Sequence, residues 1–289
     1  MVKKIVRKVA HATRNWLQEE NNGVAAQKGP LPKEYSYQWL NHVLFPKILG
    51  SDWRPHYTWG VMQGVNLARA LGIKRVSAIE FGVAGGNGLV ALEEIVKVIE
   101  PVFGVEVDIY GFDTGMGLPA PDGYRDLPNV YGESQCGMDI EKLRKRLQKA
   151  QLILGLVENT IDDFIRSKPA PIAFMSDDLD YYTASMDAFK IFDGAQDMLL
   201  PRIWCYFDDI MGPTKCDFTG ERLAIADFNA SHEMRKISSI PGLPWALPKN
   251  HFDQVWVKKV FLAHMFDHDK YGEFDELTPM DGPELELKG

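Results

Sequence analysis

Short apolar runs alternate with helical patterns along most of the chain. We predict seven strands, over 75–81, 105–112, 152–157, 171–175, 203–207, 234–240 and 254–266. Between them the apolar residues have helical spacing, which predicts helices over 56–71, 89–100, 139–150, 160–167, 184–199 and 219–231. This alternation is typical of a doubly wound, mostly parallel α/β sheet. The last two strands lack a helix between them, which indicates an antiparallel terminal edge strand.

The pattern divides the chain into three parts. Gly23, Gly29, Pro30 and Pro32 interrupt any long helix near the start, so we expect an irregular N-terminal extension over 1–55. A single α/β domain should cover 56–267, and 268–289 reads as an acidic, poorly packed tail. The N-terminal extension is candidate interface material, so a homo-oligomer is among the states that we expect.

Composition narrows the class of protein. The 32 Lys and Arg residues against 40 Asp and Glu residues give a net charge of −8, which argues against nucleic acid as the main partner. No apolar run reaches the roughly 18 residues of a membrane span. Cys136, Cys205 and Cys216 are widely spaced and form neither a zinc motif nor a disulfide framework, which favours a cytoplasmic protein.

A glycine-rich turn joins the strand over 75–81 to the following helix. Glycine lets the backbone approach a ligand closely, and a helix N-terminus offers unpaired N–H groups. The spacing differs from the GxGxxG pattern of dinucleotide-binding enzymes, and no P-loop lysine follows. A tight turn without a ligand is the alternative. The candidate ligand-binding residues here are Glu80, Gly82, Ala84, Gly86 and Asn87.

The next strand ends at an acid, Asp113, about 25 residues after the glycines. A carboxylate at this place can accept both hydroxyl hydrogens of a ribose, with Thr114 beside it. The alternative is a turn aspartate in the string Asp-Thr-Gly. Glu158 and Asn159 close the third strand at the same sheet edge, where an adenine would lie; they also fit a cap for the helix that starts at Thr160.

Two groups of aspartates directly follow two buried strands. Asp177, Asp178 and Asp180 follow the strand over 171–175, and Asp208 and Asp209 follow the strand over 203–207. Neighbouring parallel strands end at one sheet edge, so up to five carboxylates can gather in one cleft. Such a cluster predicts either a divalent cation or raised pKa values. Oxygen ligands favour Mg²⁺, Ca²⁺ or Mn²⁺ over zinc. The alternative is that each acid caps a helix or faces solvent.

Four strings of the chain resemble one family. They are Ile79–Gly88, Gly111–Pro119, Asp178–Tyr182 and Phe207–Ile210, which occur in the order seen in macrocin O-methyltransferase-like (TylF-like) enzymes. Those are metal-dependent class I S-adenosylmethionine-dependent methyltransferases that act on sugar hydroxyls of natural products. The likeness spans roughly residues 75–210. It implies a Rossmann-like methyltransferase fold, S-adenosylmethionine and Mg²⁺ as cofactors, and a small-molecule hydroxyl acceptor.

The resemblance also assigns roles. Asp178, Asp208 and Asp209 would hold Mg²⁺, and Asp180 would be the general base or a group beside the metal ligands. Glu80, Gly82, Gly86 and Asp113 would bind the methyl donor. The chain departs from the family at Asp177, which leaves open whether Asp177 or Asp178 is the metal ligand, and at Tyr181–Ser185. His232 and His251 are further candidates for the base.

Two other functions fit parts of the pattern. Asp178-x-Asp180 after a strand also fits the metal motif of a glycosyltransferase, which leaves the glycine turn unexplained. A methyltransferase-like protein that binds its ligands without turnover is the second alternative. The long loop over 114–138 is rich in Gly, Pro and Asp, and we expect it to cover the cleft through Met116, Tyr124, Arg125 and Tyr131.

Overall fold

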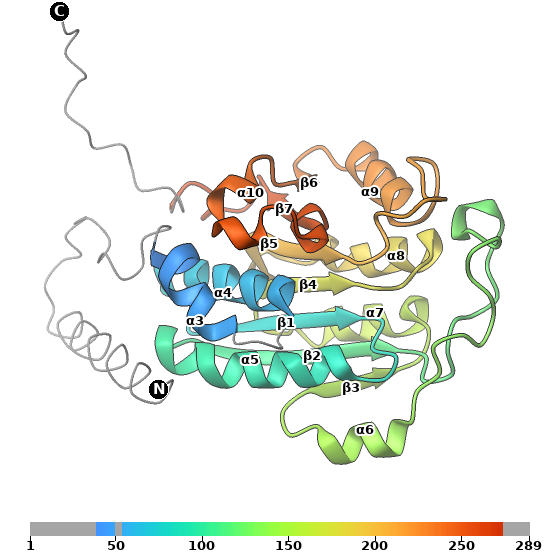
Figure 1. Cartoon of the computed structure of the whole chain (residues 1–289), viewed down its shortest axis with the longest axis horizontal. Coiled ribbons are helices and arrows are strands. Elements are labelled where there is room, and N and C mark those ends of the chain that lie inside the picture. Colours follow the sequence, from blue (N-terminus) through green and yellow to red (C-terminus); the bar gives the residue numbers. More distant parts are fainter. Residues whose placement is uncertain (1–38, 50–53, 274–289) are drawn as a thin grey trace, which may run out of the picture.

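A single mixed sheet of seven strands forms the centre of the computed structural model, which describes residues 39–49 and 54–273 (Figure 1). The strand order is β3-β2-β1-β4-β5-β7-β6. The strands are β1 (Arg75–Phe81), β2 (Glu106–Asp113), β3 (Gln151–Leu154), β4 (Ile172–Asp177), β5 (Leu199–Phe207), β6 (Arg235–Ser239) and β7 (Val260–Met265). Strands β1 to β5 pair in parallel, whereas β7 is antiparallel to both β5 and β6. The predicted doubly wound, mostly parallel sheet is confirmed, with its antiparallel strand one place inside the edge.

Helices cover both faces of the sheet, which gives three layers. One face carries α4 and α5, and the other carries α7, α8 and α9 (Figure 1). The helices are α3 (Phe45–Leu49), α4 (Pro55–Ala70), α5 (Asn87–Phe103), α6 (Ile140–Arg146), α7 (Val157–Arg166), α8 (Tyr182–Phe189), α9 (Gly220–Ser231) and α10 (Leu243–Ala246). Among the described residues, no helix combines the length and the apolar character that a bilayer crossing requires.

The core lies on both sides of the central strands. Strands β4 and β5 are buried at every position, and β1 at every position after Arg75. Parallel strands with helices on both faces need apolar residues throughout, which explains why these strands appeared in the sequence as continuous apolar runs.

The predicted end of the helix over 89–100 and the predicted start of the strand over 203–207, each next to a proline, are wrong. Helix α5 continues through Pro101 to Phe103, whose burial keeps the last turn packed, and it ends at Gly104 in the left-handed conformation. Strand β5 starts at Leu199 and contains Pro201. That proline lies where the pairing of β5 with β4 shifts register, so its missing N–H group breaks no regular ladder.

Several other boundaries differ from the predictions. The predicted helix over 184–199 ends at Phe189 and gives way to two 3₁₀ turns, η4 (Lys190–Asp193) and η5 (Gln196–Met198), on either side of Gly194. The predicted last strand over 254–266 starts only at Val260, after the 3₁₀ turn η7 (Val255–Lys258). In the first place the burial of Phe192 outweighs the local helix propensity, and in the second the burial of Trp256 outweighs the local strand propensity.

The two ends of the domain extend beyond their predicted limits. Residues 39–49 are helical, in the turn η2 (Leu40–Leu44) and in α3, and bury Leu40, Leu44 and Phe45 in the core. At the other end the guanidinium group of Arg202 lies over the ring of Tyr271, 5.2 Å from the ring centre. The rest of the predicted N-terminal extension and acidic tail lies outside the described residues.

Candidate functional site

The predicted glycine turn lies at the C-terminal end of β1, between β2 and β4. In the sheet, β2 and β3 lie on one side of β1, and β4 and β5 lie on the other, so the strand order reverses at β1. Such a switch point opens a crevice for ligands. Gly82 has a φ of 81°, and a Cβ placed on it would lie 1.9 Å from the carbonyl oxygen of Asp178. Gly82 therefore lets the turn pack directly against the chain that leaves β4.

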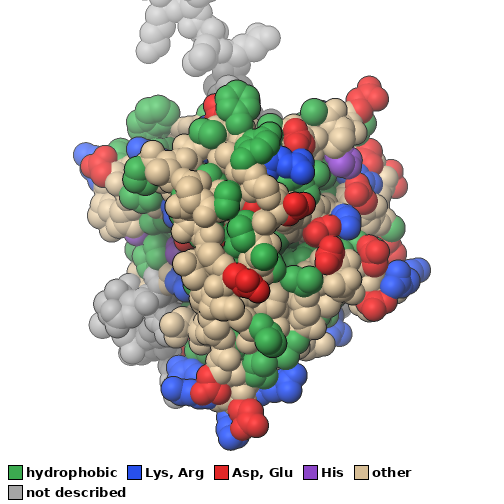
Figure 2. Space-filling model, turned by 90° about the vertical axis from the view of Figure 1, so that its right-hand side faces the viewer, with side chains coloured by type: hydrophobic (Ala, Val, Ile, Leu, Met, Phe, Trp, Pro, Cys, Tyr) green, Lys and Arg blue, Asp and Glu red, His purple; other side chains and the backbone are tan. Residues whose placement is uncertain are grey.

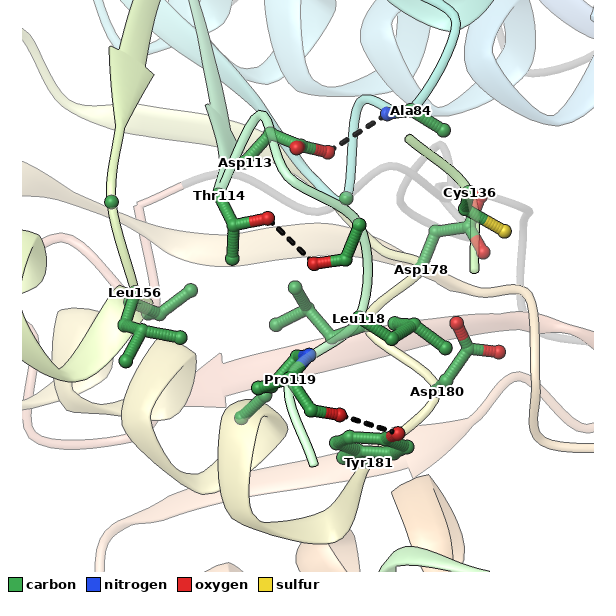
Figure 3. A pocket seen from close by; sticks show the side chains of 16 residues that line it. Ala84, Asp113, Thr114, Leu118, Pro119, Cys136, Leu156, Asp178, Asp180 and Tyr181 are labelled. Carbon is green, nitrogen blue, oxygen red and sulfur yellow. Dashed lines mark hydrogen bonds between the residues drawn. The ribbon is translucent and has the colours of Figure 1, made fainter. Parts of the chain in front are cut away.

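Asp113 organises the same turn from the end of β2. Its Oδ2 accepts hydrogen bonds from the backbone N–H groups of Val83 and Ala84, at 2.9 and 2.8 Å. Its Oδ1 accepts one from the N–H group of Gly115 at 2.6 Å. The carboxylate also lines the cleft described below (Figure 3). Asp113 thus combines the predicted cleft position with the turn role that was its alternative.

Glu80 lies beneath the turn rather than on the cleft. It is 2% exposed, and its Oε1 accepts a hydrogen bond from the hydroxyl of Tyr57 at 2.7 Å. Its Oε2 is buried without a hydrogen-bond partner. Burial raises the pKa of Glu80 to about 8. A Cβ on Gly88 would lie 1.7 Å from Oε1, so this glycine makes room for the acid. Asn87 begins α5 and is exposed.

A cleft of about 710 Å³, part of it open to solvent, runs along the C-terminal ends of the strands (Figure 3). Its walls come from the ends of β1 to β4 and from the long loop after β2. They include Gly82, Ala84, Asp113, Thr114, Leu118, Pro119, Cys136, Leu156, Val157, Asp178, Leu179, Asp180 and Tyr181.

The predicted adenine region takes a different form from that expected. Strand β3 ends at Leu154, and α7 begins at Val157, so Glu158 and Asn159 lie in the first helical turn and are exposed. Neither residue therefore caps this helix, whose N-cap residue is Leu156 and which has no side-chain capping bond there. The cleft is lined here by the apolar side chains of Leu156 and Val157.

The aspartates after β4 and β5 meet at the other end of the cleft. Asp178, Asp208 and Asp209 each offer a carboxylate oxygen, and these oxygens lie within 4.8 Å of one another. Asp177 is fully buried inside β4, where it accepts a hydrogen bond from the hydroxyl of Ser185 at 3.3 Å. The geometry thus selects Asp178 over Asp177. Figure 2 looks at this side of the molecule, where Asp and Glu side chains gather over the centre and right of the view.

Tyrosine and lysine side chains hold two of these carboxylates. Asp209 accepts hydrogen bonds from the hydroxyl of Tyr131 at 2.6 Å and from Nζ of Lys215 at 2.5 Å. Asp208 accepts hydrogen bonds from Tyr206 and Lys259, at 2.7 and 3.0 Å. These donors lower the pKa of Asp208 against the opposing effect of its burial.

Asp178 of the cluster and the neighbouring Asp180 hold their protons more tightly. Burial, with the charges of Asp208 and Asp209, raises the pKa of Asp178 to about 7. Burial and the adjacent Asp209 raise the pKa of Asp180 to about 8. Raised pKa values are what the sequence predicted for a cluster of carboxylates without a cation.

The residues present fit a divalent cation. Three carboxylates converge, and Oδ2 of Asp209 is buried without a hydrogen-bond partner. Oxygen atoms are the ligands that Mg²⁺, Mn²⁺ and Ca²⁺ prefer, whereas zinc sites usually include nitrogen or sulfur. Asp178, Asp208 and Asp209 would hold such an ion, as the resemblance implied.

Both histidines named as candidate bases are engaged elsewhere. Nε2 of His232 lies 2.8 Å from Asp193, and its Nδ1 lies 2.9 Å from the carbonyl oxygen of Phe228. His251 is 3% exposed and packs against the ring of Phe45.

The histidine beside the cluster is one that the sequence did not single out. His56 stacks on the ring of Tyr206, with 4.0 Å between the ring centres, and Tyr206 donates to Asp208. Burial and the charge of Arg54 lower the pKa of His56 to about 3, so it is neutral. Other residues that the sequence analysis missed at the cluster are Lys215 and Lys259. The string Tyr206-x-Asp208 was visible in the sequence, whereas the other contacts depend on loop geometry.

The loop over 114–138 borders the cleft, with Gly117, Leu118, Pro119 and Cys136 in its wall. Of the four residues expected to face the ligands, Tyr131 reaches Asp209, whereas Arg125 lies over the ring of Tyr182 at 4.5 Å. Met116 and Tyr124 are exposed. In Figure 1 this loop is the green segment at the right of the molecule.

Comparison with known proteins gives a likeness of fold. No family model matches the chain. No curated protein matches it either. Among solved structures, CalS11, a calicheamicin methyltransferase, is similar at a TM-score of 0.46 with 19% identity, covering 77% of this chain and 84% of that one. The O-methyltransferase NovP gives 0.48 and 12%, covering 73% and 79%. MycE methyltransferase in complex with Mg and SAH gives 0.36 and 15%, covering 73% and 51%. At such identities and scores the likeness concerns the fold alone.

Proposed function

We propose that this protein is an S-adenosylmethionine-dependent O-methyltransferase that methylates, with the help of Mg²⁺, a hydroxyl of a sugar or similar small natural-product-like acceptor. One observation carries the proposal. The wall of one cleft includes Asp113, Gly82 and Ala84 of the glycine turn, and Asp178, and the cluster of Asp178, Asp208 and Asp209 adjoins this cleft. Asp178 belongs to both the cleft wall and the cluster, so a ligand in the cleft would adjoin a bound cation.

The donor half of the cleft suits an adenosyl group. Oδ1 of Asp113 has room for about one further hydrogen bond, because a carboxylate accepts about four in all and this one accepts three from the backbone, two of them on Oδ2. A ribose hydroxyl would donate to it. Leu156 and Val157 offer the apolar wall that an adenine ring needs, and the turn at Gly82 leaves space for the methionine part.

The acceptor half supplies acid–base chemistry. A bound Mg²⁺ would lower the pKa of the attacking hydroxyl and orient it. Asp178, Asp208 and Asp209 would hold the ion, and Asp180, which lines the cleft, would take the proton of the hydroxyl. The main contribution of the protein is to align the acceptor oxygen with the sulfonium methyl group, since orientation accounts for much of such rate enhancements.

The two alternatives fit the geometry less well. A glycosyltransferase would use Asp178 and Asp180 together as ligands, but the convergent group is Asp178 with Asp208 and Asp209. A protein that only binds its ligands has no need for the aligned set of carboxylates at the end of the cleft. We therefore keep the methyltransferase as the proposal.

Thermal-shift titrations with S-adenosylmethionine, S-adenosylhomocysteine, NAD and UDP-glucose, each with and without Mg²⁺, test the donor. We expect stabilisation by the two adenosyl ligands alone. Release of S-adenosylhomocysteine with a catechol or a methyl glycoside that carries vicinal hydroxyls tests the reaction. Stabilisation by UDP-glucose, and none by the adenosyl ligands, would overturn the proposal.

A further inference from the structure

The backbone at Asp180 has a conformation that L-residues rarely adopt. Its φ is 64°, and the N–H group of Tyr181 donates to the carbonyl oxygen of Leu179 across it, at 2.6 Å. This is a γ-turn of the positive-φ form, which is rare and strained. Strain of this kind persists only where the surrounding structure holds it, and it is often found at functional sites.

The side chains that follow the turn are held by the loop over 114–138. Tyr181 is 1% exposed, and its hydroxyl donates to the carbonyl oxygen of Pro119 at 3.0 Å (Figure 3). Two residues later Thr183 donates twice to Asp126, from its N–H group at 3.0 Å and from its hydroxyl at 2.9 Å. Both anchors thus lie on the loop that borders the cleft.

Asp126 is built into this contact. It is fully buried, and besides the two bonds from Thr183 its Oδ2 accepts one from the N–H group of Asp122 at 2.8 Å. Helix α8 starts at Tyr182 and has no capping bond from its own N-cap side chain. Asp126 therefore caps α8 from 57 positions away in the sequence, and it can do so only while the loop is docked.

The opposite side of the turn is also fixed. Gly82 packs so closely on the carbonyl oxygen of Asp178 that the chain leaving β4 has no room to relax toward β1. The strained turn is thus held between the glycine turn on one side and the docked loop on the other. What this arrangement places in the cleft is the side chain of Asp180.

We propose that Asp126 is a positioning residue: by capping α8 at Thr183, the docked loop holds the γ-turn that directs the Asp180 carboxylate into the cleft. The inference rests on the proposed function, in which Asp180 takes the proton of the acceptor. It adds that the docking of the loop and the alignment of Asp180 with the acceptor occur together.

Three variants test this link. Thr183→Val removes the hydroxyl that bonds Asp126 and keeps the shape of the side chain, whereas Thr183→Ser keeps the hydroxyl. Asp122→Asn is the matched control, because Asp122 lies on the same loop, its side chain is exposed, and only its backbone bonds Asp126.

Amide hydrogen exchange of the protein with S-adenosylhomocysteine and Mg²⁺ is the first readout. In Thr183→Val we expect exchange roughly tenfold faster or more over 119–127 and 180–183, with β2 unchanged. Thr183→Ser and Asp122→Asn should exchange as the wild type does. Unchanged exchange in Thr183→Val, or the same acceleration in Asp122→Asn, would overturn the proposal.

Kinetics with S-adenosylmethionine and a catechol are the second readout. We expect kcat of Thr183→Val to fall by roughly ten- to a hundredfold, with both KM values within about twofold, and Thr183→Ser to recover most of kcat. Faster exchange with an unchanged kcat would overturn the positioning role. If the wild type methylates no acceptor, the proposed function fails, while the exchange result still decides whether the loop holds the turn.

Discussion

The two ends of the cleft hold their carboxylates in opposite ways. At the donor end Asp113 accepts three backbone hydrogen bonds and has no other acid bonded to it. At the acceptor end Asp178, Asp208 and Asp209 crowd together, and lysine side chains stand beside two of them. A carboxylate bound by backbone N–H groups organises a turn even without a ligand. A group of mutually repelling carboxylates, by contrast, would be stabilised by a cation.

The two ends also differ in how much of each could be predicted from the sequence. The donor end is made by one strand–turn–helix and the next strand end, so its residues follow from spacing, as Gly82 and Asp113 did. The carboxylates of the acceptor end could also be placed, because neighbouring parallel strands end at one edge. Their partners Lys215 and Tyr131 come from loops, and no periodicity fixes where a loop residue points.

The largest effect that we expect is a loss of methyl transfer when the acceptor end is changed and the donor end is left intact. Replacing Asp208 with Asn removes a charged ligand, so Mg²⁺-dependent methyl transfer should fall about thousandfold, while the affinity for S-adenosylhomocysteine stays within about twofold. Asp193→Asn, at an exposed aspartate paired with His232, is the control and should leave both unchanged. Full activity of the wild type in EDTA would contradict the role of the metal.

The converse variant tests the donor end. In Asp113→Asn the amide nitrogen cannot accept hydrogen bonds, so the turn and the ribose contact are both weakened. We expect the Kd of S-adenosylhomocysteine, measured by calorimetry, to rise by roughly ten- to a hundredfold, with Mn²⁺ binding retained. Asp108→Asn, on the same strand in a surface pair with Arg75, is the matched control. Equal losses in the two variants would refute the specific role of Asp113.

A substitution in the glycine turn should have a smaller effect, which is a loss of stability. Gly82→Ala places a Cβ against Asp178 at a positive φ and should cost about 3 kcal/mol, which lowers Tm by roughly 6–12 °C. Gly85→Ala, three residues on, meets nothing within 4 Å and should leave Tm within about 2 °C. Wild-type stability of Gly82→Ala would show that the turn is not packed as described.

The smallest effect is a pH dependence of the metal-free protein. The pKa of Glu80 is raised to about 8 from an ordinary value of 4.5, so the folded state binds this proton more tightly than the unfolded chain does. Its contribution to stability is complete below about pH 4.5 and is lost as the pH rises toward 8. Tm of the metal-free protein should therefore fall between pH 5 and pH 8, and Asp178 and Asp180, whose pKa values are raised as well, should add to the fall.

Two variants assign that pH dependence. Glu80→Gln stays neutral throughout, so its Tm should fall less over the same interval. Glu141→Gln, at a side chain that is 89% exposed, should follow the wild type. Identical slopes for Glu80→Gln and the wild type would show that another group takes up the proton.

The strands and helices of the fold could be predicted from the sequence, whereas several of their boundaries could not. Continuous apolar runs identified the central strands because both faces of β1, β4 and β5 are covered by other elements. Pro101 and Pro201 misled the prediction, since tertiary packing tolerates a proline in the last turn of a helix and at a register shift. The cap of α8 by Asp126 could not be predicted, because it joins residues far apart in the sequence.

A crystal structure of the complex with S-adenosylhomocysteine and Mn²⁺ would show both ends of the cleft at once. We expect a ribose hydroxyl on Asp113, and an anomalous manganese peak between Asp178, Asp208 and Asp209, with the sulfur of the ligand directed toward that ion. A complex in which the adenosyl ligand lies away from Asp113, or manganese lies away from the three aspartates, would contradict it.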